Sequence, residues 1–256
     1  MQNRSETRPL AGKVAVVTGS ARNIGKAIAM RLADEGAALV INARTSQAEV
    51  EATVNEIRTA GGQAVGCLAD VTRPADVERL MHCARDEFGG LDILVNNAAV
   101  RQEGRLDTLT LEDWRSVLAI ILDGAFLCAQ AAAPLLRQSD SGAIVNIGGL
   151  TGSSGGSDRA HVVTGKAGLI GLTKALAWDL SDDGITVNLV SPGMVATDRT
   201  HSSSAVRPRH HSVHKPLLGR RGTPEEIAGV VYSLCGPDGR FMTGQTIHVN
   251  GGTYLP

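Results

Sequence analysis

The stretch 13–36 constrains the fold of this 256-residue chain more than any other part of it. It begins with a run of apolar residues at 14–17, continues through Thr18 and Gly19, and then shows apolar residues at helical spacing. This order predicts a buried strand, a glycine turn and a helix. Glycine lets the backbone approach a ligand closely, and the first turn of a helix offers unpaired N–H groups to an anion. The stretch therefore predicts a phosphate-binding loop.

Strand and helix patterns alternate along the rest of the chain. Seven strands with six helices predict an α/β fold, a single-domain Rossmann-type doubly wound parallel sheet with helices on both faces. The whole chain, 1–256, is then one domain, with a polar arm at 1–9 and a long connection at about 194–223. After the first pair, we expect strands at 37–43, 63–69, 91–95, 143–147, 185–190 and 246–250, and helices at 47–59, 74–88, 111–136, 159–179 and 224–235.

Composition narrows the function classes. A formal net charge of −1 gives no reason to expect nucleic acid or an anionic membrane as a partner. The four cysteines lack metal or redox spacing, and the arm 1–9 lacks the apolar core of a signal peptide, so we expect a cytoplasmic protein without a metal. The most apolar helix, at 117–136, is interrupted by Asp123, Gln130 and Pro134, and we interpret it as buried rather than membrane-spanning.

Six short motifs follow one another along the chain. They are Thr18-Gly19 with Ile24-Gly25, Ala69-Asp70-Val71, Asn96-Asn97-Ala98-Ala99, Val187-Asn188, Ser191-Pro192-Gly193 with Thr197, and Val249-Asn250-Gly251-Gly252. In this order and spacing, over about 10–252, the chain resembles the short-chain dehydrogenase/reductase family. The resemblance implies NAD or NADP as cofactor, and hydride transfer between the nicotinamide and an alcohol or ketone of a small molecule. It also implies a homotetramer built through two long helices and the C-terminal strand.

The resemblance and the physics of the loop agree on the phosphate site. Gly19, Ile24 and Gly25 are expected to line the pyrophosphate of the cofactor. Asn23 stands where the family more often has glycine. Because asparagine tolerates left-handed backbone geometry better than most residues, we expect the loop to keep its shape.

The end of the second strand bears on the choice between NAD and NADP. An NAD site typically has a carboxylate at the end of this strand, where it binds the ribose hydroxyls, and the segment 40–44 contains no carboxylate. Arg44, together with Arg22 in the glycine loop, is suited to clamp a 2′-phosphate. The alternative is that both arginines are solvated surface residues. We therefore predict NADP, with NAD the less favoured cofactor.

Further cofactor contacts follow from the resemblance alone. Two of them have simpler alternatives: Asp70 could cap the helix that begins at 74, and the turn at 191–193 could be an ordinary turn. The expected contacts are Asp70 and Val71 at the adenine, Asn97 and Ala98 along the cofactor, Lys166 at the ribose, and Pro192, Gly193 and Thr197 near the nicotinamide carboxamide.

The catalytic set that the family uses is incomplete in this chain. The resemblance calls for a serine, an asparagine, and a tyrosine four residues before a lysine on one helical face. Lys166 is present, but the tyrosine position is Val162, the serine position is Gly149 and the asparagine position is Ile121. Three of these four side chains cannot exchange a proton.

Two residues remain as candidates for proton transfer. Lys166 either holds the ribose or donates a proton to a carbonyl by itself. His161 neighbours the tyrosine position, but one helical step turns a side chain by about 100°. It acts only if the helix begins later or rotates, and otherwise it is a histidine on the flank of a helix start.

The connection between the last two strands is basic. The segment 199–221 contains no Asp or Glu. In the family this segment covers the substrate, so the charge favours an anionic substrate such as a carboxylate or phosphate; the alternative is a solvated loop. A metal site at the histidines is not favoured, because no acid or cysteine accompanies them. The charged residues are Arg199, Arg207, Arg209, Lys215, Arg220 and Arg221, and the histidines are His201, His210, His211 and His214.

Three hypotheses follow. The first is an NADP(H)-binding oxidoreductase that acts weakly on a carbonyl or alcohol substrate, or with an atypical proton donor. The second is a catalytically inactive NADP(H)-binding sensor or partner subunit. The third is a non-redox lyase or isomerase that reuses the same site. Nucleotide binding separates the third from the first two, and turnover separates the first from the second.

Overall fold

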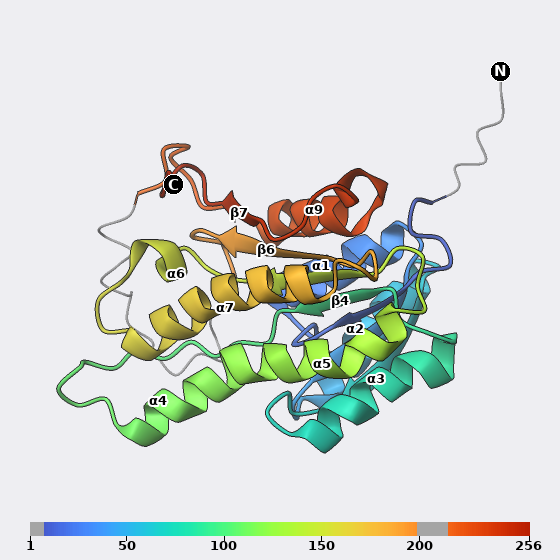
Figure 1. Cartoon of the computed structure of the whole chain (residues 1–256), viewed down its shortest axis with the longest axis horizontal. Coiled ribbons are helices and arrows are strands. Elements are labelled where there is room, and N and C mark those ends of the chain that lie inside the picture. Colours follow the sequence, from blue (N-terminus) through green and yellow to red (C-terminus); the bar gives the residue numbers. More distant parts are fainter. Residues whose placement is uncertain (1–7, 199–214) are drawn as a thin grey trace.

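A computed structural model describes residues 8–198 and 215–256 of the chain (Figure 1). Its seven strands form one sheet in the order β3-β2-β1-β4-β5-β6-β7, and every neighbouring pair is parallel. This confirms the predicted Rossmann-type sheet. The strands are β1 (Val14–Val17), β2 (Ala38–Ala43), β3 (Gln63–Leu68), β4 (Ile93–Asn96), β5 (Ala143–Ile147), β6 (Thr186–Pro192) and β7 (Thr246–Val249).

Helices cover both faces of the sheet, because successive strand residues point to opposite sides. Ala15 and Val17 pack in one apolar core with α1, α2 and α9, whereas Val14 and Val16 pack in the other with α3, α5 and α7. Figure 1 shows α5 and α7 lying in front of the strands. The helices are α1 (Asn23–Asp34), α2 (Gln47–Thr59), α3 (Pro74–Phe88), α4 (Leu111–Leu118), α5 (Gly124–Leu136), α6 (Thr151–Ser154), α7 (Ala160–Asp179) and α9 (Pro224–Cys235), with a short 3-10 turn, η2 (Pro237–Gly239), after α9.

The helix predicted at 111–136 contains a π-helical turn, η1 (Ala119–Asp123), between α4 and α5. Val117 of α4, Ile121 of η1 and Ala125 of α5 pack with α7 in a small third core, whereas Cys128 and Ala132 of α5 pack under the sheet. The glycine- and serine-rich stretch after β5, for which no helix was expected, forms the one-turn helix α6.

The segment Leu111–Leu136 is, by length and composition alone, apolar enough to cross a membrane. In the structure, 39% of its most apolar window is buried. Its second half packs between α3 and the strands β4 and β5. This packing supports the interpretation of the segment as a core helix of the fold.

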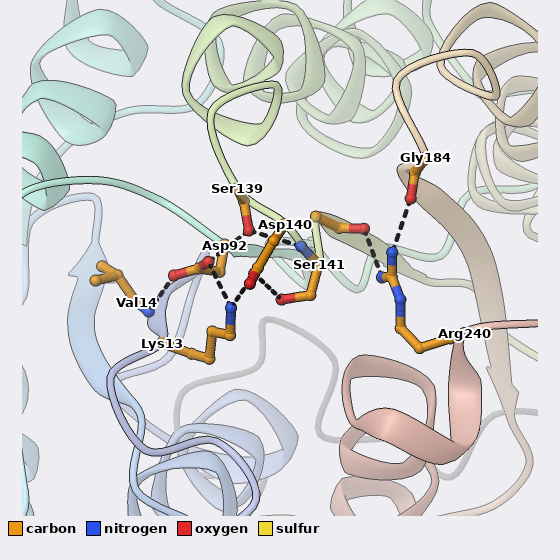
Figure 2. A network of polar contacts seen from close by, with 9 residues as sticks. Lys13, Val14, Asp92, Ser139, Asp140, Ser141, Gly184 and Arg240 are labelled. Atoms are coloured by element: carbon orange, nitrogen blue, oxygen red, sulfur yellow. Dashed lines mark hydrogen bonds and ion pairs between the residues drawn. The ribbon is translucent and has the colours of Figure 1, made fainter.

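The amino ends of the strands are tied together by a network of charged and polar groups (Figure 2). Asp92, just before β4, accepts a hydrogen bond from the backbone N–H of Val14 at 2.8 Å and from the Ser139 hydroxyl at 2.5 Å. The Lys13 ammonium lies between Asp92 at 3.4 Å and Asp140 at 2.5 Å. One carboxylate thus connects the starts of β1 and β4 with the turn that leads into β5.

Arg240 forms a second set of hydrogen bonds at the same edge of the sheet. Its guanidinium donates to the backbone carbonyl of Gly184 at 2.8 Å, as Figure 2 shows. It also donates to the backbone carbonyl of Gly142 at 3.1 Å. These carbonyls lie shortly before β5 and β6. Four adjacent strands are therefore held in register at their amino ends, opposite the edge where the glycine loop lies.

We expect Asp92→Ala to lower the free energy of unfolding by about 2–3 kcal/mol, because the Val14 N–H and the Lys13 ammonium lose a charged acceptor. Urea unfolding followed by circular dichroism measures the change. Glu87→Ala, which removes the same charge from the exposed end of α3, is the matched control. Equal unfolding midpoints for the two variants would contradict a structural role for this network.

Candidate functional site

The glycine loop follows β1 at the point where the strand order reverses, between β1 and β4. Gly19 has φ +62° and Asn23 has φ +52°, so both adopt the left-handed geometry that the sequence analysis expected position 23 to tolerate. A Cβ atom on Gly25 would lie 2.3 Å from the Gly19 carbonyl oxygen. The loop therefore folds tightly over the first turn of α1, whose N–H groups face the carboxyl edge of the sheet.

The Asn23 side chain makes a contact that a glycine could not make. Its Oδ1 accepts from the backbone N–H of Asp198 at 2.9 Å, and its Nδ2 donates to the Asp198 carbonyl at 3.3 Å. This amide pair connects the glycine loop to the chain that leaves β6.

A buried asparagine on β2 holds the loop from one side. Asn42 Oδ1 accepts from the Gly19 N–H at 3.1 Å, and Nδ2 donates to the carbonyls of Cys67 and Ala69, both at 3.1 Å. The Asn42 N–H also donates to the Ser20 hydroxyl at 2.9 Å. Asn42 was not among the predicted site residues. The sequence contains one indication of its role, because Asn42 is a polar amide at the end of the otherwise apolar segment 38–41.

Asn97, which follows β4, holds the loop from the other side. Its Nδ2 donates to the carbonyls of Thr18 at 2.9 Å and Gly19 at 3.0 Å. The Thr18 hydroxyl in turn accepts from the N–H groups of Asn97 and Ala98. Asn97 and Ala98 were expected to lie along the cofactor, and the structure places them beside the glycine loop.

The two arginines expected near a 2′-phosphate lie at the same end of the site. Arg44 is exposed directly after β2. Arg22 precedes α1, and its guanidinium lies 3.6 Å from the Glu49 carboxylate on α2. The Arg22 side chain is 50% exposed, so this is a surface ion pair that leaves the guanidinium accessible to solvent.

Asp70 does not cap α3. Its carboxylate accepts from the Thr72 N–H at 3.0 Å and the Thr72 hydroxyl at 2.8 Å, which makes a local turn before the helix. The cap residue is Arg73, and its side chain makes no capping bond. Val71 packs in the core, where a Cβ on Gly124 would approach it to 2.8 Å.

The nicotinamide end of the expected site lies beyond β5 and β6. Pro192 ends β6, and its carbonyl accepts from the Leu150 N–H at 2.9 Å, next to Gly149. Gly193 approaches Asn250 so closely that a Cβ would lie 2.6 Å from its Cα. Thr197, a few residues further, accepts a hydrogen bond from Arg101 at 3.3 Å.

Lys166 is the charged group at the centre of this end of the site. It lies on α7 and is 9% exposed, and its Nζ donates to the Ile147 carbonyl at 2.6 Å. Burial, together with the positive charges of Arg101 and Arg159, lowers the pKa of Lys166 to about 8. With this pKa the amine is mostly protonated at neutral pH, and its neutral form becomes well populated as the pH approaches 8.

The positions that the family would fill with tyrosine and asparagine are apolar and packed. Val162 and Ile121 belong to one small core with Val117 and Leu169, and both are almost fully buried. At Gly149 the situation differs, because the nearest atom to an added Cβ would be Lys166 Cγ at 4.0 Å. There is therefore room for a serine side chain beside the lysine, but no hydroxyl is present.

His161 is fully buried at the start of α7. Among the described residues, neither ring nitrogen has a hydrogen-bond partner. Burial lowers the pKa of His161, and the nearby Asp113 carboxylate opposes that shift. A neutral, enclosed imidazole fits a residue on the flank of the helix better than a proton carrier that exchanges with substrate.

Most of the basic connection lies outside the described residues. His201, His210, His211 and His214 fall in 199–214, as do Arg199, Arg207 and Arg209, so the anion and metal interpretations of that segment are not addressed. Arg220 is described, and it binds Glu226 in a bidentate pair at 2.6 and 2.9 Å. Arg220 therefore supports the start of α9 and is not a spare cation for a substrate. Lys215 and Arg221 are exposed.

A tight glycine loop at the reversal point of a doubly wound parallel sheet defines a nucleotide-binding Rossmann protein. Comparison narrows this class. A family model described as Enoyl-(Acyl carrier protein) reductase matches residues 19–254. A 3-oxoacyl-[acyl-carrier-protein] reductase from Synechocystis sp. is 39% identical over 252 residues, covering 96% of this chain and 98% of that protein. The corresponding Vibrio cholerae enzyme is 38% identical over 96% of this chain and 99% of its own.

Solved structures agree. A dehydrogenase/reductase from Sinorhizobium meliloti superposes with a TM-score of 0.90 at 37% identity, covering 97% of this chain and 98% of its own. A short-chain dehydrogenase from Burkholderia cenocepacia, solved in complex with NADP, superposes with a TM-score of 0.88 at 36% identity, covering 96% and 99%. The chain belongs to the short-chain dehydrogenase/reductase family.

Proposed function

We propose that this protein is an NADP(H)-dependent reductase of small ketones, with Lys166 in place of the tyrosine as the proton donor. The main support for the proposal is a contrast between the two ends of the site: the cofactor loop is firmly held, but the catalytic set is reduced to one side chain that can donate a proton. The cofactor loop is held by Asn42 and Asn97, whereas Lys166 is the one member of the usual catalytic set whose side chain carries a proton. The relatives named above act on 3-oxoacyl groups, so a 3-oxo compound is the substrate class to examine first.

The residues present fit a phosphorylated dinucleotide. The loop over α1 offers backbone N–H groups to the pyrophosphate, and no carboxylate follows β2 within 40–44. Arg44, directly after β2, and Arg22, directly before α1, are the two guanidinium groups that we propose for the 2′-phosphate. Two similar proteins were solved with NADP or NADPH bound, the Burkholderia cenocepacia enzyme and a blue fluorescent protein from a metagenomic library.

When bound, the reduced cofactor supplies a hydride to the carbonyl carbon. The chain must then protonate the carbonyl oxygen, and Val162 and Ile121 are unable to do so. The Lys166 ammonium donates this proton and becomes a neutral amine, which regains a proton from solvent. A general acid typically contributes about 10²–10⁴-fold to rate, and an amine held by a backbone carbonyl is a less well placed acid than a tyrosine. Turnover is therefore expected to be slow.

Two rival functions remain as outcomes of the same assays. Tight NADPH binding without reduction of any carbonyl compound would favour an inactive sensor or partner subunit. Failure to bind either nucleotide would favour a lyase or isomerase that reuses the site.

The proposal includes a homotetramer in the cytoplasm. Phe126 on α5 and Trp178 on α7 are 45% and 83% exposed, although both are large apolar residues. Burial of such side chains between subunits would remove them from water. The two helices are those through which the family resemblance expects subunits to associate, and light scattering on the purified protein measures the assembly.

We expect Arg44→Ala to weaken NADPH binding by about 10-fold or more, because a charge-assisted hydrogen bond to phosphate is worth roughly 1.5–3 kcal/mol. NADH lacks the 2′-phosphate, and its affinity should not change. Titration followed by nicotinamide fluorescence measures both constants. Arg85→Ala, in the last turn of α3, is the charge-matched control. A parallel loss of NADPH and NADH affinity would contradict the assignment of Arg44.

The pKa of Lys166 sets the expected pH dependence. The protonated amine is the donor, so kcat for reduction should be level below pH about 8 and fall as the pH rises through that value. Lys166→Arg keeps a positive charge but cannot release a proton near neutral pH, and should lower kcat by about 10²-fold or more. A variant that retains kcat and changes only KM for NADPH would show that Lys166 merely holds the ribose.

Gly149→Ser combined with Val162→Tyr should raise kcat by about 10²-fold by supplying the missing hydroxyls. The serine has space, whereas the tyrosine must displace apolar neighbours and should cost about 1–3 kcal/mol of stability. Gly149→Ala with Val162→Phe adds similar volume without hydroxyls and is the matched control. Equal rates for the two double variants would show that proton supply does not limit turnover.

A further inference from the structure

Asn23 occupies a backbone position that suits glycine better than asparagine. Its φ is +52°, a left-handed conformation that glycine adopts without steric cost and that most other residues avoid. Asn23 is also the first residue of α1, where the glycine loop passes into the helix. A side chain at such a position needs compensating contacts, and the structure shows what they are.

Both polar atoms of the Asn23 side chain bind the backbone of one residue, Asp198, which lies 175 positions further along the chain. The Asp198 N–H donates to Oδ1 at 2.9 Å, and Nδ2 donates to the Asp198 carbonyl at 3.3 Å. A side-chain amide that pairs with the N–H and the carbonyl of the same residue restricts its orientation as well as its distance. Asn23 thus holds Asp198 in one arrangement relative to the glycine loop.

The segment that leads from β6 to Asp198 is also bound at its start. Gly193 donates its N–H to the Val249 carbonyl at 2.9 Å, and Val195 forms a parallel bridge with Gly222. These backbone contacts fix the first residues of the segment against β7 and the chain before α9. The Asn23 amide then fixes the segment at Asp198.

Thr197 lies between these two anchors. The family resemblance places this residue near the nicotinamide carboxamide, and its hydroxyl accepts a hydrogen bond from Arg101 at 3.3 Å. Because Thr197 directly precedes Asp198, the Asn23 amide restricts the distance between Thr197 and the glycine loop. The glycine loop is the expected pyrophosphate site, so one side chain connects the two ends of the cofactor site.

The glycine loop has other supports that do not involve the Asn23 side chain. Asn42 accepts the Gly19 N–H at 3.1 Å, and Asn97 donates to the Gly19 carbonyl at 3.0 Å. Glycine adopts the φ of position 23 freely. Replacing Asn23 by glycine is therefore expected to keep the loop and to remove its connection to Asp198.

We propose that Asn23 is a positioning residue for the nicotinamide. Its amide holds Thr197 at a fixed distance from the glycine loop, so that the nicotinamide half of NADPH binds against a residue that is already in place. The inference rests on the proposed binding of NADP(H), and it assigns to Asn23 the part of the affinity that comes from the nicotinamide. A direct bond from the Asn23 amide to the pyrophosphate is the competing role.

Two ligands separate these roles. NADPH and 2′-phospho-ADP-ribose carry the same pyrophosphate and the same 2′-phosphate, but the second lacks the nicotinamide. We expect Asn23→Gly to weaken NADPH binding by about 5- to 10-fold, because the two hydrogen bonds that hold the segment at Thr197 are lost. The affinity for 2′-phospho-ADP-ribose should not change. Calorimetric titration of the full chain measures both affinities.

Two further variants make the comparison specific. Asn55→Gly, the same substitution at an exposed position of α2, is the matched control and should change neither affinity. Asn23→Asp sets a carboxylate against the Asp198 carbonyl and loses the donor. Its charge weakens both ligands alike, so the ratio of the two affinities still reports on the nicotinamide, and we expect this ratio to fall. An equal loss for both ligands in Asn23→Gly, or an unchanged ratio in both Asn23 variants, would overturn the proposal.

Nicotinamide fluorescence adds a readout that a purely structural role would not change. At saturating NADPH, we expect the emission of Asn23→Gly to shift toward that of free NADPH, whereas Asn55→Gly keeps the wild-type emission. Wild-type emission in Asn23→Gly would contradict the positioning role. NADPH binding without any ketone reduction would remove the reductase function and retain this inference. Failure of the wild-type protein to bind either ligand would remove both.

Discussion

The glycine loop is held by two buried amides that reach it from neighbouring strands. Asn42 accepts the Gly19 N–H from the β2 side, and Asn97 donates to the loop carbonyls from the β4 side. A loop of this kind has no regular hydrogen-bond ladder of its own, so its backbone groups need such partners. The first turn of α1, the start of the chain beyond β4 and the segment at Asp198 are all positioned relative to this loop.

The two ends of the site differ in chemistry. At the glycine loop, polar groups are paired with backbone groups in a way that suits an anion beside α1. Near Lys166, Val162 and Ile121 bury apolar surface instead, and the charge comes from Lys166 and two arginines. Replacing polar side chains by packed apolar ones removes proton exchange while keeping the helices together. The fold is thus typical of its family, whereas the atypical reaction centre is part of the proposed function.

Sequence periodicity predicted the parts of the fold that depend on local pattern. All seven strands and the glycine loop follow from apolar runs and glycine spacing, and Asn23 adopts the geometry expected of it. Residues whose partners come from distant segments were missed. Asn42 binds carbonyls on β3, and Arg159 is placed by a bridge to Gly104. No spacing along the chain reveals such contacts, since they arise only once the strands are ordered in the sheet.

The network around Asp92 has a consequence at the opposite edge of the sheet. It anchors the starts of β1, β4 and the turn into β5, and these strands have only 4, 4 and 5 residues. The length of each strand thus sets the distance between its anchored amino end and the candidate site at its carboxyl end. A strand rises about 3.3 Å per residue, so inserting one residue into β1 would carry Thr18 past Asn97 by more than a hydrogen bond tolerates. Strand length in this protein is therefore as constrained as side-chain identity.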